Sequence, residues 1–203
     1  MLTDDELRDN LARLRPFEND EDQIYLDSRG FPTIGVGYCL FSAEDAVRIP
    51  FHHVSDGTLA TPGEVRLEYF RVLSMTKGLP AYKYRGGPAT ALHILPADNE
   101  AEGFRRLRLM LDGLPHVFPN FESFPDCVQQ RLLDLGWNCG LGAYPGLMGW
   151  HGLRLACNAT PPNWLQAAHE CTTANPNHAR TREARNAWRV EGFMQATRLG
   201  YVS

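Results

Sequence analysis

The N-terminal residues place apolar side chains at the spacing of one helix face. Three leucines lie four and three residues apart, as that spacing requires: Leu7, Leu11 and Leu14. Thr3 and Glu6 form a capping-box pattern, in which the threonine oxygen accepts from a first-turn amide and the glutamate reaches back. Pro16 has no amide hydrogen, so we expect the helix to end or kink near Arg15. Glu18 would then lie just past the end of the helix.

A β-hairpin is predicted next. Residues 24–26 and 31–34 are short apolar runs on either side of the turn-rich segment 27–30. Gly35 and Gly37 follow at once, and a glycine permits backbone conformations and close approaches that a side chain forbids. We expect this hairpin to be the only sheet of the molecule.

The rest of the chain is predicted to be helical. Thr61 and Glu64 form a second capping box ahead of a helix that Gly78 stops, and residues 81–97 suit an irregular connection. Further helices are expected up to Gly113, after Pro125, and over about 143–156, 163–172 and 179–198. The predicted fold class is α+β, with a small N-terminal hairpin lobe packed against a larger helical lobe. We expect one domain over 1–203, made of a hairpin lobe at 17–40, a lengthened connection at about 42–99 and a helical lobe at about 100–203.

Composition and charge limit the classes of partner. The chain has 203 residues and a net charge of -4, which argues against a nucleic-acid partner because phosphate binding draws on clustered Lys and Arg. No apolar run approaches the ~20 residues that a membrane span needs, so no membrane partner is expected. The N-terminal residues are acidic and amphipathic, so we expect no signal peptide and synthesis in the cytoplasm. The densest basic segment, 180–185, suits either a solvated helix face or the binding of an acidic polymer.

The five cysteines are an odd number, so at least one thiol is free or pairs between chains. Small, buried apolar thiols are the favoured interpretation, and Cys157 with Cys171 is one conceivable bridge. His151 and His169 lie near these two cysteines in the sequence, but the paired spacing of a zinc knuckle is missing. We therefore predict no metal and no cofactor.

Acidic residues around the predicted hairpin suggest one chemistry. Cleavage of a glycosidic bond needs a protonated carboxylic acid at the leaving oxygen and an ionised carboxylate across the sugar ring. Glu18, beside the apolar Phe17, suits the first role, and Asp27, in a polar turn, suits the second. The hydroxyl of Thr33 could hold a water molecule. By residue type alone, the acidic run 20–22 is an equal source of carboxylates.

Residues 17–37 resemble the active-site signature of phage-type lysozymes, a family of muramidases. The signature runs Glu, eight residues, Asp, five residues, Thr, then Ile-Gly-x-Gly, and Glu18, Asp27 and Thr33 fit it in spacing and identity. Residues 135–144 are similar to a second segment of that family, Phe-Asn-x-Gly-x-Gly-Ala-Phe. The two segments occur in the order that the family has.

The resemblance implies a lysozyme-like fold, with the active-site cleft between the two lobes, and a role for each matched residue. Glu18 would be the general acid, Asp27 the second carboxylate, and Thr33 the partner of the attacking water. The second segment implies that Asn138 contacts substrate. Trp137 and Tyr144, which flank it, suit either a sugar platform or a core anchor. Arg182 is a further substrate-binding candidate, because 180–183 loosely resembles an arginine-rich helix of the family. Because the family is inverting, the two carboxyl groups are expected roughly 6.5–9.5 Å apart with a water between them.

The implied activity is hydrolysis of the bond between N-acetylmuramic acid and N-acetylglucosamine in peptidoglycan. The implied partners are peptidoglycan glycan strands, with an immunity protein or a secretion apparatus as further candidates. Action would be in the periplasm or cell wall of a target cell. Many phage enzymes of this kind are strongly basic and this chain is not, which favours a delivered antibacterial effector domain, such as a type VI secretion effector, over a free phage endolysin.

Two departures from the family keep alternatives open. Tyr38 stands where many relatives have histidine, and the segment at about 42–99 is longer than in compact phage enzymes. A catalytically silent peptidoglycan-binding module is one alternative. A chitinase or a lytic transglycosylase on the same fold is another.

Overall fold

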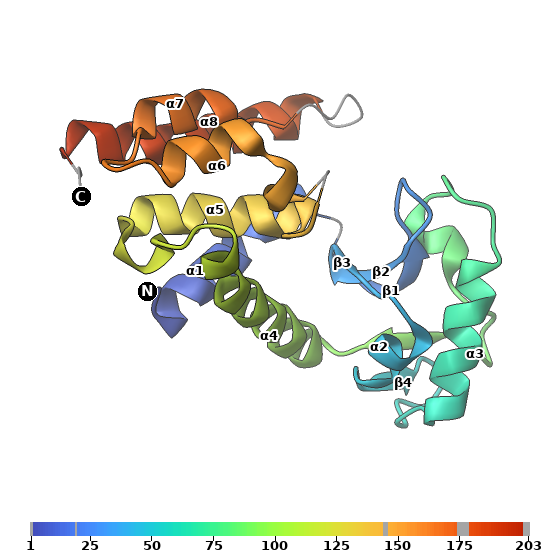
Figure 1. Cartoon of the computed structure of the whole chain (residues 1–203). Coiled ribbons are helices and arrows are strands. Elements are labelled where there is room, and N and C mark those ends of the chain that lie inside the picture. The colour runs from blue at the N-terminus through green and yellow to red at the C-terminus, as the bar shows by residue number, and fades with distance from the viewer. Residues whose placement is uncertain (1, 19, 144–145, 174–178, 201–203) are drawn as a thin grey trace. The chain divides into compact units, whose positions relative to one another are not determined.

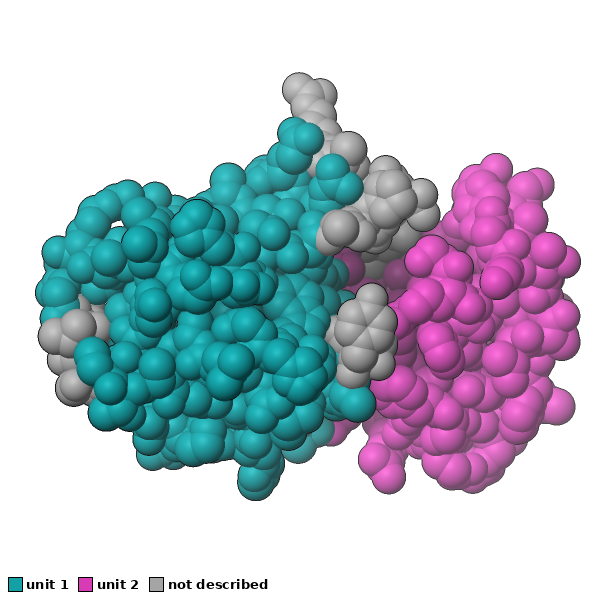
Figure 2. Space-filling view, turned by 45° about the horizontal axis from the view of Figure 1, so that its top comes forward, with its two compact units in different colours: residues 1–17, 106–203 teal, residues 18–105 magenta. Residues whose placement is uncertain are grey.

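A computed structural model describes residues 2–18, 20–143, 146–173 and 179–200, the last segment by its backbone alone up to residue 181. The chain forms two compact units, which Figure 2 distinguishes by colour. Unit 1 comprises Met1–Phe17 with Arg106–Ser203, and unit 2 comprises Glu18–Arg105. Helices and small antiparallel sheets are both present, so the structure is mixed α and β as predicted. No helix within the described part of the chain is long and apolar enough to cross a membrane.

The predicted hairpin is the main sheet of unit 2. It consists of β1 (Asp20–Leu26), β2 (Pro32–Val36) and β3 (Tyr38–Cys39), antiparallel and in that order. β2 is buried along its whole length and β1 from Gln23 onward, so both faces of the hairpin are covered there. β1 carries an irregularity between Glu21 and Tyr25, where the pairing register shifts against β2.

Unit 2 contains a second sheet that the sequence did not predict. β4 (Phe51–His53) pairs antiparallel with β5 (Leu92–Ile94), so the expectation of a single sheet is wrong. The segment 81–97, expected to be irregular, holds η2 (Ala81–Tyr84), β5 and the start of α4. Each strand is three residues long, too short for alternation to be read along the sequence.

Two helices of unit 2 begin at capping residues. α2 (Ala43–Val47) is capped by Ser42, and α3 (Pro62–Leu73) begins with the predicted capping box of Thr61 and Glu64. α3 ends at Leu73, before the Gly78 that was expected to stop it. α4 (Pro96–Gly113) ends at the predicted glycine, and the division between the two units falls within it.

Unit 1 consists of helices alone among its described residues. α7 packs against both α6 and α8, and α5 packs against α8 (Figure 1). The α-helices of unit 1 besides the end of α4 are α1 (Asp4–Leu14), α5 (Asp126–Cys139), α6 (His151–Cys157), α7 (Trp164–Glu170) and α8 (Ala179–Arg198). Single 3-10 turns separate them: η1 (Arg15–Phe17), η3 (Leu114–His116), η4 (Phe121–Ser123) and η5 (Leu147–Gly149).

The helix expected over 143–156 is shorter than predicted. Helix α6 begins only at His151, after the separate turn η5. A Cβ on Gly146 would lie 2.5 Å from the Gly142 carbonyl oxygen, so a glycine is needed at that position.

An ionic cluster is buried in the helical core of unit 1. Asp134 of α5 pairs with both Arg185 and Arg189 of α8, and all three side chains are less than 10% exposed. The segment 180–185 is therefore not simply a solvated face, since its last arginine is buried. Burial lowers the pKa of Arg189, and the Asp134 charge opposes that shift.

All five cysteines are free thiols, so the conceivable bridge between Cys157 and Cys171 is not formed. Both side chains are fully buried, as the interpretation of small apolar thiols predicts. Burial raises the pKa of Cys171 to about 11 and that of Cys157 further still.

Candidate functional site

Glu18 lies between η1 and β1, as the sequence predicts, and is half-buried. Its carboxylate packs against Gly37, which connects β2 to β3 with a φ of +73°. A Cβ on Gly37 would lie 2.7 Å from Oε2 of Glu18, so only glycine leaves room for this carboxylate. The strand pairing therefore places Glu18 beside the β2–β3 turn.

Asp27 lies at the hairpin turn and is held by the turn's own backbone. Its Oδ1 accepts hydrogen bonds from the amides of Arg29 at 2.9 Å and Phe31 at 2.8 Å. The other oxygen, Oδ2, is 3.5 Å from Nε of Arg29, and the Asp27 side chain is 19% exposed. Two amide donors and the Arg29 cation therefore hold the Asp27 carboxylate in place within the turn.

Thr33 of β2 is buried, and its hydroxyl donates to the carbonyl of Phe31 at 2.9 Å. A hydroxyl has one proton and two lone pairs, so this bond leaves its oxygen as an acceptor for other donors. The Phe31 residue thus links the two predicted site residues, since its amide binds Asp27 and its carbonyl binds Thr33.

Cys39 belongs to the same group, although the sequence did not single it out. It pairs with Thr33 across β2 and β3, and its Sγ is 3.9 Å from the Thr33 hydroxyl. Burial raises the pKa of the Cys39 thiol, hydrogen bonds to Thr33 and Arg29 oppose this, and the Asp27 charge adds to it. The thiol is therefore neutral near pH 7. The two glycines before it were the available signal, because a turn at 35–37 brings Cys39 opposite Thr33.

A buried hydrogen-bond chain supports the other end of the hairpin. The hydroxyl of Tyr38 donates to Oδ1 of Asn99 at 2.9 Å, and Nδ2 of Asn99 donates to Asp20 at 2.7 Å. Tyr38, which departs from the family pattern, thus packs inside unit 2. Asp22, another member of the acidic run, pairs with Arg85 at 2.8 Å. Two of the three carboxylates in the acidic run 20–22 are therefore engaged in structural contacts.

The predicted substrate-binding residues belong to unit 1. Trp137 and Asn138 are neighbours in the last turn of α5, the first half-buried and the second exposed. Arg182 is half-buried on α8. Tyr144 lies outside the described residues. The structure thus groups Glu18, Asp27 and Thr33 on one hairpin, and it describes the remaining candidates within the other unit.

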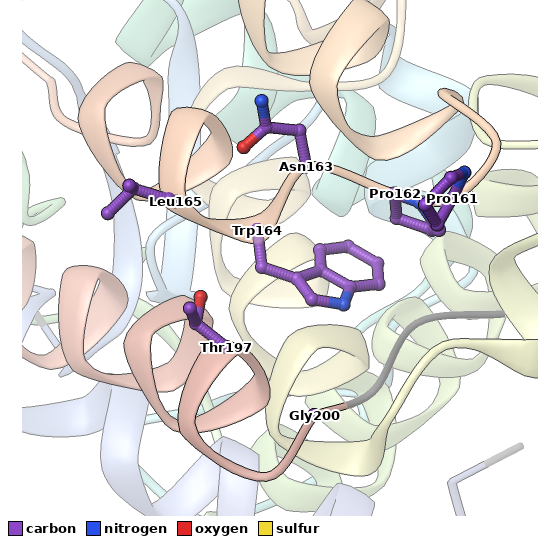
Figure 3. Close-up of a pocket in the computed structure, with 7 residues that line it drawn as sticks. All are labelled: Pro161, Pro162, Asn163, Trp164, Leu165, Thr197 and Gly200. Carbon is purple, nitrogen blue, oxygen red and sulfur yellow. The ribbon is translucent and has the colours of Figure 1, made fainter.

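A pocket of about 300 Å³ lies elsewhere in unit 1 (Figure 3). It is mostly apolar, and none of the predicted site residues line it: its walls are Pro161, Pro162, Asn163, Trp164, Leu165, Thr197 and Gly200. No group of three or more His, Cys, Asp or Glu side chains in the described ranges could hold a metal ion.

Comparison with known protein families and with curated proteins finds no match to this chain. The local geometry of the hairpin and the sequence motifs are therefore the basis for assigning a function.

Proposed function

We propose that the protein is a peptidoglycan hydrolase, a muramidase with a lysozyme-like fold, whose catalytic groups are carried by the β1–β2 hairpin. One observation carries the proposal: the hairpin binds Asp27 to the amide and Thr33 to the carbonyl of a single residue, Phe31, while Glu18 packs at Gly37 beyond the end of β2. These are the three residues that the motif singles out.

Each group suits a step of inverting glycoside hydrolysis. Glu18 donates its proton to the leaving glycosidic oxygen. Asp27, held by the turn, accepts a proton from the attacking water on the opposite side of the sugar. The Thr33 oxygen accepts the water's second hydrogen, because its own proton is committed to the Phe31 carbonyl. The water's lone pair is then free to attack the anomeric carbon.

The length of β2 favours this division of roles. Thr33 and Gly37 are four residues apart, which at about 3.3 Å per residue keeps their Cα atoms within roughly 13 Å. The residue beside the acid and the residue of the water-holding pair are therefore no more than about 13 Å apart at their Cα atoms. An inverting reaction needs carboxyl groups roughly 6.5–9.5 Å apart, and that separation stays a prediction.

Peptidoglycan as substrate follows from the motif resemblance, and so does the site of action. We place the activity in the periplasm or cell wall of a target cell, with the protein acting as a delivered antibacterial effector domain or as an endolysin. Trp137, Asn138 and Arg182 are the proposed substrate contacts in unit 1.

The decisive test is analysis of the products. Purified sacculi are digested with the protein, and the released muropeptides are examined by mass spectrometry. A muramidase leaves reducing muramic acid ends. Anhydro-muramic ends would show a lytic transglycosylase, and binding to sacculi without any release would show a silent binding module. Cleavage of chitin alone would show a chitinase.

A further inference from the structure

Arg29 is an exposed cation fixed directly beside the candidate catalytic carboxylate. We propose that its guanidinium binds a carboxylate of the substrate and thereby selects glycan that carries acidic substituents over uncharged glycan. This inference rests on the proposed muramidase function and names the feature of the substrate that the site recognises.

The position of Arg29 is set on three sides. Its Nε is 3.5 Å from Oδ2 of Asp27, and its guanidinium carbon is 5.4 Å from the centre of the Phe31 ring. It also hydrogen-bonds the Cys39 thiol. The side chain nevertheless remains 56% exposed. A cation held by an ion pair and a ring face has lost part of its rotamer freedom before any ligand arrives.

Asp27 does not depend on this guanidinium for its position. Its Oδ1 is already bound by two backbone amides, at 2.9 and 2.8 Å, whereas the Arg29 Nε lies at the longer distance of 3.5 Å. An arginine presents five N–H donors in a planar fork, and its Nε is the atom that lies toward Asp27, while the side chain remains 56% exposed. The exposed edge is therefore suited to a ligand.

A carboxylate is the group that this edge fits best. The planar fork of arginine matches the two oxygens of a carboxylate, and charge-assisted pairs of this kind are the stronger hydrogen bonds in proteins. Peptidoglycan presents carboxylates on the peptides attached to muramic acid, whereas chitin presents none. Because the chain carries a net charge of -4, a general electrostatic attraction to an acidic polymer is missing. The Arg29 guanidinium supplies that attraction at the site itself.

The test compares two forms of one substrate. Soluble glycan–peptide fragments are used as prepared, or after carbodiimide and methylamine have converted their free carboxylates to uncharged amides. The wild type is expected to cleave the charged form better. Arg29→Gln should lower that preference by about 10- to 100-fold, mainly through KM, because one charge-assisted contact is lost. Arg29→Lys, which keeps the charge without the fork, should retain part of the preference.

Two controls make the result interpretable. Arg48→Gln makes the same charge change at an exposed arginine of unit 2, in an ion pair with Asp45, and should leave the preference unchanged. Raising the salt concentration should weaken wild-type cleavage of the charged form more than that of the amidated form. This second control needs no variant, so a folding defect cannot obscure it.

The outcomes separate the two claims. If the wild type cleaves neither form, the muramidase function is wrong and the inference falls with it. If the wild type cleaves both forms equally, or if Arg29→Gln lowers kcat on both forms to the same extent, the muramidase function stands. Arg29 would then be a positioning residue for Asp27, and carboxylate recognition would be overturned.

Discussion

At the scale of single residues, the candidate site depends on a glycine where a carboxylate needs room. Gly37 has a positive φ of +73°, and its missing side chain leaves the space that Glu18 occupies. Gly37 belongs to the motif, and the room that it leaves for Glu18 is a physical reason for a glycine at this position. The same scale also shows what the sequence could not reveal. Arg29 and Cys39 join the site through the hairpin turn and the β2–β3 pairing, and neither residue belongs to the motif.

Gly37→Ala should therefore impair activity more than its strain alone would explain. Alanine in a left-handed conformation costs about 1–2 kcal/mol, and its methyl group would also displace the Glu18 carboxylate. A misplacement of about 1 Å can lower a rate by about 100-fold. The measurements are the free energy of unfolding and the rate of peptidoglycan cleavage.

Gly57→Ala is the matched control for this variant. Gly57 has the same φ of +73° in the same unit, and a Cβ on it would meet nothing within 4 Å. The Gly57→Ala variant should lose about as much stability as Gly37→Ala and should cleave peptidoglycan at the wild-type rate. Equal rates in the two variants would mean that Gly37 does not shape the position of Glu18.

At the scale of elements, the hairpin and the capped helices follow from local sequence signals. Capping boxes at Thr3 and Thr61 and the turn at 27–30 involve residues close together in the chain, and all three form as predicted. The pairing of β4 with β5 joins distant segments through strands of three residues. Such pairing is decided by tertiary packing, which a single sequence does not display.

The chain of hydrogen bonds from Tyr38 through Asn99 to Asp20 ties the hairpin to the first turn of α4. Tyr38→Phe removes a buried donor and leaves the Asn99 oxygen without it, so unit 2 should lose about 1–3 kcal/mol of stability. Denaturant unfolding measures this loss. Hydrogen exchange of the β1 amides should also become faster.

Tyr82→Phe is the control for that variant, because Tyr82 is 67% exposed. Removing the Tyr82 hydroxyl should change the free energy of unfolding by less than about 0.5 kcal/mol. If the two variants unfold alike, the Tyr38 hydrogen bond contributes nothing to the hairpin's support.

At the scale of the whole molecule, unit 1 is distinguished by the ionic cluster in its core. Unit 1 buries Asp134 between two arginines, a pattern that the charge count of the chain does not reveal. Sequence reasoning treated the end of 180–185 as surface, because charged residues are rarely buried unless they are paired. The partner, Asp134, lies on α5, far away in the sequence.

Asp134→Asn should destabilise unit 1 strongly. The variant leaves Arg185 and Arg189 buried without the negative charge between them, and breaking a buried pair in this way costs about 3–5 kcal/mol. Glu191→Gln breaks an exposed pair with Arg198 on the same helix, α8, and should lower the melting temperature far less. Thermal unfolding of both variants checks the contrast, and similar melting temperatures would contradict it.

The central claim is that Glu18 is the acid of a glycoside hydrolase. The most direct measurement is the rate of release of reducing ends from purified sacculi by the wild type, Glu18→Gln and Glu21→Gln. We expect Glu18→Gln to lose about 10²–10⁴ in rate, while Glu21→Gln, the same chemical change three residues along the chain, keeps nearly all of it. Undiminished release of reducing ends by Glu18→Gln would show that Glu18 is not the acid.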